Sequence, residues 1–166
     1  MKRDDIQLLY QYNEWANRRI LDAAAGVSPE ELTAPNDLGW GDLRGLLVHI
    51  MTAEIGWRNR LSGLGEVARP EATDFPDVAS ISARYKAETA KLWDYLNGLS
   101  DADVSGPVTF ERDGRQRSST LWHFLAHVVN HGTQHRAECA ALLTGFGHSP
   151  GDMDFTLFLR QREESA

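Results

Sequence analysis

Apolar side chains recur along the chain at steps of three and four residues, the spacing that places them on one face of an α-helix. Four long segments show this pattern. We predict helices over residues 3–25, 42–63 and 78–97, and from the end of "SST" to about Thr144. Glycines follow the first, third and fourth segments, where glycine commonly ends a helix. A weaker pattern predicts a further helix from Asp152 to Arg160.

The connections between these helices complete the predicted fold. "VTFERDGRQRSS" contains an Asp113-Gly114 pair that predicts a small hairpin, although a bare loop explains the same letters equally well. "GLGEVARPEATDFPD" is long for a turn between antiparallel helices, so it is able to cross the bundle lengthwise and make helices two and three parallel. Because no strand series is visible, an all-α four-helix bundle is the economical fold, as a single domain over residues 1–166.

Composition narrows the class of protein. A hydrophobic content of 42% argues against disorder. A net charge of -7 without a Lys/Arg cluster argues against nucleic acid as the main partner. We expect neither a membrane span nor a secretion signal, because no apolar run reaches the required ~18 residues and the first residues lack an apolar core. With the single cysteine Cys139 there is no intrachain disulfide, and the cytoplasm is the default compartment.

The fourth helix carries histidine at an unbroken four-residue step in "HFLAHVVNHGTQHR", at positions 123, 127, 131 and 135. A helix turns by about 100° per residue, which places His131 and His135 in the apolar stripe around Phe124. His127 falls on the shoulder of that stripe, and His123 points toward solvent or the edge of a neighbouring helix. The run therefore divides into an inward pair and an outward pair.

The inward pair predicts a metal site. Two adjacent imidazoles cannot both be charged cheaply in an apolar bundle, whereas a divalent metal binds the deprotonated ring nitrogen. Histidines at i and i+4 both reach one ion, and His49 is the best third ligand because it lies near the midpoint of another helix. Three histidines leave coordination positions open, as catalytic sites require. Zinc, nickel, cobalt, iron and manganese all accept imidazole, and the residues do not choose among them.

Several residues have two interpretations each. The three histidines themselves are alternatively hydrogen-bonded core residues. Glu138 either accepts a hydrogen bond from a ligand, or acts as a base, or is an exposed carboxylate at the helix edge. His127 either supports the site or is structural. Cys139 either ligates a soft metal or packs in the core, and the five tryptophans are most simply core and interface anchors.

Missing motifs exclude other chemistries. The chain has no H-E-x-x-H, so the base of a metalloprotease is absent. It has no Glu-x-x-His pair at the inward positions, which argues against a ferritin-like di-iron centre. Neither a P-loop nor G-x-G-x-x-G is present, so a nucleotide cofactor is not indicated.

Three stretches, "YNEWANRRILDAAAGVSPEEL", "LLVHIMTAEIGWRNRLSG" and "LAHVVNHGTQHRAECAALLTGFG", resemble the DinB-like (YfiT-like) superfamily over nearly the whole chain. The resemblance implies an up-down-down-up four-helix bundle with a long crossover between helices two and three. It also implies a divalent metal, often nickel or zinc, whose ligands here are His49, His131 and His135. Family members often read H-x-x-H-H-R-G-Q. Here "HGTQHRAE" places Gln134, Ala137 and Glu138 at the departing positions, which leaves the ligands intact and changes their surroundings.

The resemblance also implies an activity, because relatives include S-transferases that use low-molecular-weight thiols and a mycothiol-dependent isomerase. We expect a metal-dependent enzyme of this type, acting on a small-molecule thiol and an electrophile, with the thiol bound as thiolate at an open metal position. Arg136, Arg58 or Arg60 either binds carboxylates of the thiol cofactor or is an ordinary surface charge. The alternative is a non-catalytic metal-binding stress-response protein that the metal stabilises. Family and composition also suggest a homodimer.

Overall fold

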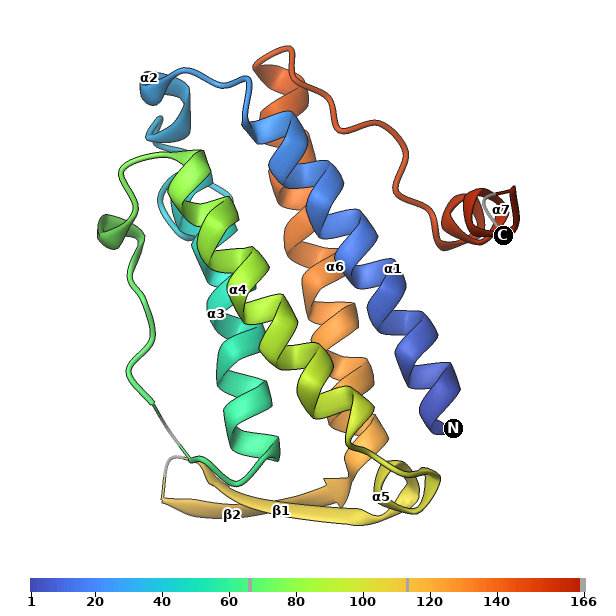
Figure 1. Cartoon of the computed structure of the whole chain (residues 1–166). Coiled ribbons are helices and arrows are strands. Elements are labelled where there is room, and N and C mark those ends of the chain that lie inside the picture. Colours follow the sequence, from blue (N-terminus) through green and yellow to red (C-terminus); the bar gives the residue numbers. More distant parts are fainter. Residues whose placement is uncertain (66, 113, 165–166) are drawn as a thin grey trace.

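The computed structural model describes residues 1–65, 67–112 and 114–164, and this part of the chain is mostly helical with one small hairpin (Figure 1). The elements are α1 (Arg3–Ala24), α2 (Pro29–Leu32), α3 (Leu43–Leu61), η1 (Ala72–Asp74), α4 (Val78–Asn97), α5 (Asp101–Ser105), β1 (Pro107–Arg112), β2 (Arg115–Thr120), α6 (Leu121–Gly145) and α7 (Phe155–Glu164). Among the described helices, none is long and apolar enough to cross a membrane.

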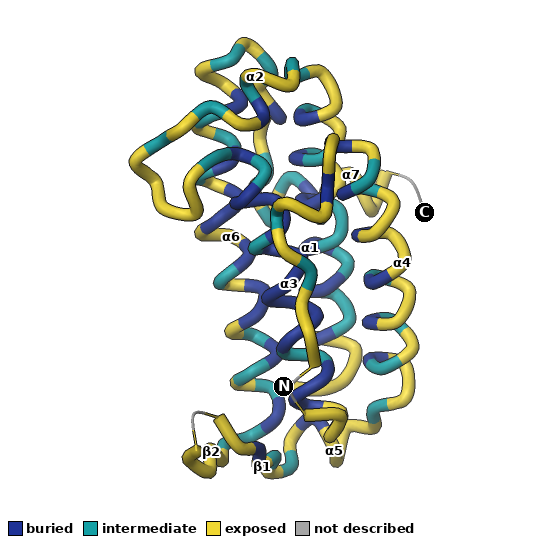
Figure 2. The backbone as a smooth tube through the Cα atoms, turned by 90° about the vertical axis from the view of Figure 1, so that its left-hand side faces the viewer, coloured by how far each residue is buried: buried dark blue, intermediate teal, exposed yellow. Residues whose placement is uncertain are grey.

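The long helices α1, α3, α4 and α6 lie side by side, with α6 packed against both α1 and α3 (Figure 1). The chain between α3 and α4 returns along the outside of the helices, from the end that holds the hairpin to the end that holds α2. Buried residues line the faces that the helices turn toward one another (Figure 2). They form two apolar clusters, one toward each end of the bundle.

The helix starts follow from capping residues visible in the sequence. The Asp42 carboxylate accepts a hydrogen bond from the backbone N–H of Gly45 at 2.7 Å and begins α3. The Asp77 carboxylate likewise accepts a hydrogen bond from the backbone N–H of Ser80 at 2.8 Å and caps the start of α4. The prediction for the last helix is less accurate, because α7 begins at Phe155 rather than Asp152. Residues 151–154 before it have no regular secondary structure, and Gly151 has a φ of 70°.

The hairpin interpretation of the segment before α6 is confirmed. Strands β1 and β2 pair antiparallel, with Val108 opposite Ser119 and Phe110 opposite Arg117. The turn was predicted at Asp113-Gly114, of which Asp113 lies outside the described residues. The Phe110 ring packs edge-on against the ring of Trp57, with centroids 5.7 Å apart, and thereby fastens the hairpin to the helices.

Candidate metal centre

Three histidines from two helices converge on one point between α3 and α6. The Nε2 atom of His49 lies 3.1 Å from that of His131 and 3.2 Å from that of His135. Each of the three residues offers a ligand atom, and these atoms all lie within 4.8 Å of one another. The structure thus brings together the inward pair of α6 and the candidate from α3, which are 82 and 86 residues apart in sequence.

The spacing of these nitrogens fits a metal ion. Zinc–nitrogen bonds of about 2.0–2.1 Å in a tetrahedral site separate two ligand nitrogens by about 3.3 Å, close to the distances found here. Without a cation, three nitrogens at this separation repel one another through their lone pairs unless protons lie between them. A shared divalent ion satisfies all three at once, so the donor set suits an imidazole-binding metal.

The electrostatics of the cluster favour neutral rings. Burial lowers the pKa of His49 from 6.5 to about 4, assisted by the neighbouring charges of His135, His131 and Arg69. Burial likewise lowers the pKa of His131 to about 4, assisted by His135 and His127 and opposed by the Glu138 carboxylate. Both rings are therefore unprotonated near neutral pH, which is the form that binds a metal.

Glu138 is placed to orient one of the three rings. Its Oε2 atom lies 2.6 Å from Nδ1 of His135, one turn back along α6. With the proton on Nδ1 donated to this carboxylate, Nε2 of His135 is left unprotonated and directed at the other two nitrogens. Glu138 is only partly exposed and its oxygen is engaged, so its geometry differs from that of a freely exposed helix-edge carboxylate.

The other two histidines of α6 lie outside the cluster. The His127 ring is exposed and contacts the Trp57 ring edge-on at 5.2 Å between centroids. The His123 Nδ1 lies 2.7 Å from the Ser119 hydroxyl, at the hairpin end of the helix. Cys139 is fully buried in an apolar cluster, and burial raises the pKa of its thiol to about 12, which makes it a packing residue.

The Trp40 side chain covers the site from the loop that precedes α3. Its ring stacks on His49 with centroids 3.5 Å apart and planes 17° from parallel, although 54% of the residue is exposed. The interpretation of Trp40 as a core anchor is therefore wrong. The sequence held a signal for this role, because Gly39 and Gly41 on both sides of Trp40 allow a backbone with positive φ, which is typical of a loop rather than of a core helix.

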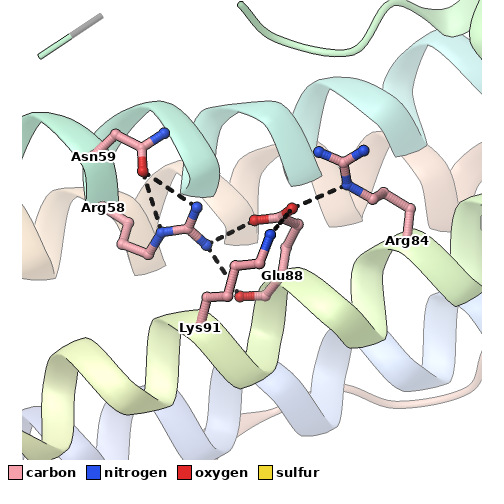
Figure 3. Close-up of polar contacts among 5 residues, drawn as sticks. All are labelled: Arg58, Asn59, Arg84, Glu88 and Lys91. Atoms are coloured by element: carbon pink, nitrogen blue, oxygen red, sulfur yellow. Dashed lines mark hydrogen bonds and ion pairs between the residues drawn. The ribbon is translucent and has the colours of Figure 1, made fainter. Parts of the chain in front are cut away.

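The arginines proposed for a cofactor's carboxylates are engaged elsewhere. Arg136 is only 2% exposed and donates to the side chains of Asn13 and Asn17, so neither cofactor binding nor surface charge describes it. Arg58 donates to the Glu88 carboxylate at 2.7 Å, where Arg84 and Lys91 also meet it (Figure 3). Arg60 is buried, with its guanidinium over the Trp57 ring and the Phe110 ring.

Arg69, which sequence reasoning missed, is the arginine whose positive charge lowers the pKa of His49. It lies in the connection between α3 and α4, where the residue is exposed. Its guanidinium rests against Gly56, at which an added Cβ would come within 3.3 Å of the guanidinium carbon. A side chain on α3 at this point would therefore push Arg69 away from the helix.

A buried polar network sits beside the histidine cluster and was also missed. It joins Asn13 and Asn17 of α1, Glu54 of α3, Tyr85 of α4 and Arg136 of α6. Burial raises the pKa of the Glu54 carboxyl, and hydrogen bonds from its neighbours oppose that rise. The signal was present, because Asn13 and Asn17 stand at core-facing positions of the first predicted helix, where apolar residues are expected.

The fold and the site together define a mostly helical protein with a three-histidine cluster suited to a metal ion. The chain belongs to the DinB family, whose characteristic sequence pattern matches residues 1–165. Protein DinB of Bacillus subtilis (strain 168) is 24% identical in an alignment of 167 positions that covers 95% of this chain and 96% of that protein. The crystal structure of a DinB-like protein from Bacillus cereus ATCC 10987 has the same fold. It matches with a TM-score of 0.71 and 20% identity over 92% of this chain and 99% of that one.

Proposed function

We propose that this protein is a metal-dependent enzyme of the low-molecular-weight thiol S-transferase type, with zinc or nickel held by His49, His131 and His135. The observation that carries the proposal is the convergence of three imidazole nitrogens from two helices. Three protein ligands leave coordination positions for a small molecule, as in catalytic rather than closed structural sites.

A divalent ion at this point supplies a positive charge that favours the thiolate form of a bound thiol. The three imidazoles hold the ion, and Glu138 keeps the His135 proton on Nδ1, away from it. In the transfer step the thiolate sulfur forms a bond to an electrophilic carbon. The leaving group departs with its bonding electrons, and the thiol proton passes to solvent. The chain then needs only to orient the two reactants.

Arg69 supports an anionic thiol as the substrate. The residue is exposed, its guanidinium lies against Gly56 of α3, and its charge acts on His49. A guanidinium in this position offers a bidentate partner to a carboxylate carried by the thiol. The substrate class is accordingly a small thiol that bears at least one carboxylate.

Metal content and thiol conjugation test the proposal. The purified protein is loaded with zinc or nickel, dialysed and analysed for metal. Its conjugation of cysteine-containing low-molecular-weight thiols to an electrophilic dye is then measured. We expect one retained ion per chain and thiol loss that His131→Ala abolishes. His123→Ala is the matched control, because it removes a histidine of the same helix outside the cluster. A parent protein that retains no ion contradicts the proposal.

The alternative function is metal binding without turnover, as in a stress-response protein. It draws support from the position of the cluster, because an ion held by α3 and α6 stabilises the folded chain by mass action. In that case removal of the metal lowers the melting temperature, while the metal-loaded protein conjugates none of the low-molecular-weight thiols to the electrophilic dye.

A further inference from the structure

The loop before α3 holds three consecutive residues in the left-handed region. Gly39 and Gly41 have φ values of 84° and 80°, and Trp40 between them has a φ of 56°. Glycine adopts this conformation freely, but a bulky side chain at positive φ is a genuine outlier. Strain of this kind persists where surrounding structure enforces it, and it clusters at ligand clamps and active sites.

Helix α3 is shaped to receive this loop. An added Cβ at Gly45 would overlap the Trp40 carbonyl oxygen, so only glycine lets the loop come this close to the helix. The same carbonyl accepts a hydrogen bond from the Asp42 N–H at 3.0 Å, and the Asp42 side chain caps α3. The backbone of Trp40 is thereby fixed one turn before the His49 ring.

The strained backbone places the indole on a predicted metal ligand rather than in the core. The ring stacks on His49, and the His135 ring meets it edge-on at 6.3 Å between centroids. More than half of the residue stays exposed, so apolar burial does not explain why the conformation is kept. What the strain achieves is an exposed aromatic ring against two of the three histidines.

We propose that Trp40 is a positioning and specificity-determining residue: it holds the His49 ring in the ligating orientation and offers its exposed indole surface to a flat, aromatic acceptor. The first part rests on the metal site of the proposed function, and only the second part rests on its transfer activity. An imidazole bound to a cation is electron-poor, so stacking on an electron-rich indole stabilises the loaded state. An exposed indole beside open coordination positions favours planar ligands, which stack at low entropic cost.

Metal affinity tests the positioning role. Trp40→Gly removes the ring and also relieves the left-handed strain, so the metal-free variant should melt no lower than the parent. Competition with a chromophoric chelator should show zinc binding weakened about tenfold or more, the usual effect of losing a group that supports a metal ligand. Trp40→Phe keeps a ring and should lose less. Trp122→Phe, at the hairpin end, should bind like the parent.

Fluorescence gives a second readout that a purely structural residue would not move. Nickel should quench the emission of the parent and of Trp122→Phe, and Trp40→Phe should lose most of that quenching. A Trp40→Gly variant that binds zinc as tightly as the parent overturns the positioning role, whatever its melting temperature. If Trp40→Gly binds zinc more weakly than the parent, but neither protein conjugates a thiol, the positioning role stands and only the proposed transfer activity is refuted.

Acceptor preference tests specificity. We expect Trp40→Gly to raise KM several-fold for a planar aromatic acceptor such as 1-chloro-2,4-dinitrobenzene, and to change it little for the small aliphatic acceptor iodoacetamide. Trp122→Phe should leave both unchanged. An equal change for the two acceptors in Trp40→Gly contradicts the specificity role.

Discussion

Arg136 and Glu54 lie on different helices, and the same two asparagines link their opposite charges at the centre of the bundle. The Arg136 guanidinium donates to the side-chain oxygens of Asn13 and Asn17 at 2.6 and 2.9 Å. The amide groups of these asparagines donate in turn to one oxygen of Glu54 at 2.7 and 3.0 Å. Each buried charge is thus solvated by protein dipoles, which removes much of the cost of burying it.

This link predicts a large penalty for removing one charge alone. Arg136→Met keeps most of the side-chain volume but leaves Glu54 buried without a cation. We expect the free energy of unfolding to fall by about 3–5 kcal/mol. The double variant Glu54→Gln/Arg136→Met should recover part of that loss, because no charge remains unpaired. Urea denaturation measures both. If Arg136→Met is as stable as the parent, the polar network does not contribute to the stability of the folded chain.

Glu138 offers a test of ligand orientation. Glu138→Gln leaves the His135 ring with a weaker acceptor on Nδ1, and we expect zinc affinity to fall about tenfold. Glu163→Gln, at an exposed position of α7, serves as the charge-matched control. Isothermal titration with zinc measures the difference, and equal affinities in the two variants would remove Glu138 from the site.

The lowered pKa values of His49 and His131, about 4 each against 6.5, predict an acid-labile metal-free protein. Between these values the unfolded chain binds more protons than the folded one, so the histidines contribute stability above pH 6.5 that is lost as the pH falls toward 4. Glu54 acts in the opposite sense, because its raised pKa makes the folded state bind the extra proton.

Melting curves of the metal-free protein between pH 7 and 4 check this expectation. The melting temperature of the double variant His49→Gln/His131→Gln should fall less with decreasing pH than that of the parent, because both chains keep Glu54 and differ only in the two rings. Parallel curves for the parent and the variant would mean that these histidines titrate normally in the folded chain.

Arg69 predicts a charge-selective effect on substrate binding. Under the proposed function, Arg69→Gln should raise KM several-fold for a carboxylate-bearing thiol and leave KM for an uncharged thiol such as 2-mercaptoethanol unchanged. Arg115→Gln, an exposed arginine of β2, is the control for net charge. The opposite result, an equal rise for both thiols, would indicate a structural effect on α3.

Periodicity in the sequence was enough to predict the four long helices and to divide the histidines of α6 into inward and outward pairs. Periodicity assigns a residue to a face but does not say what that face meets. Asn13 and Asn17 were therefore visible as core-facing polar residues, while their partner Arg136 was interpreted as either a cofactor-binding residue or a surface charge.

The position of Trp40 depends on the conformation of three residues in a loop, and neither helical spacing nor composition specifies it. Arg69 was missed for a related reason: it lies in a connection, and its electrostatic effect on His49 depends on the path of the chain between α3 and α4. The face on which a helical residue lies was predictable, whereas the positions of side chains on connecting segments were not.

That division has an evolutionary consequence. The three imidazoles and the asparagine-bridged charges lie on the long helices, where a one-residue shift of α6 would disturb both. Trp40 and Arg69 come from the two segments that flank α3, which tolerate substitution and length change far better than helices do. Under the proposed function, relatives built on the same scaffold would therefore be free to exchange one reactant for another by changing two loops, while the histidine cluster and the helix register stay as they are.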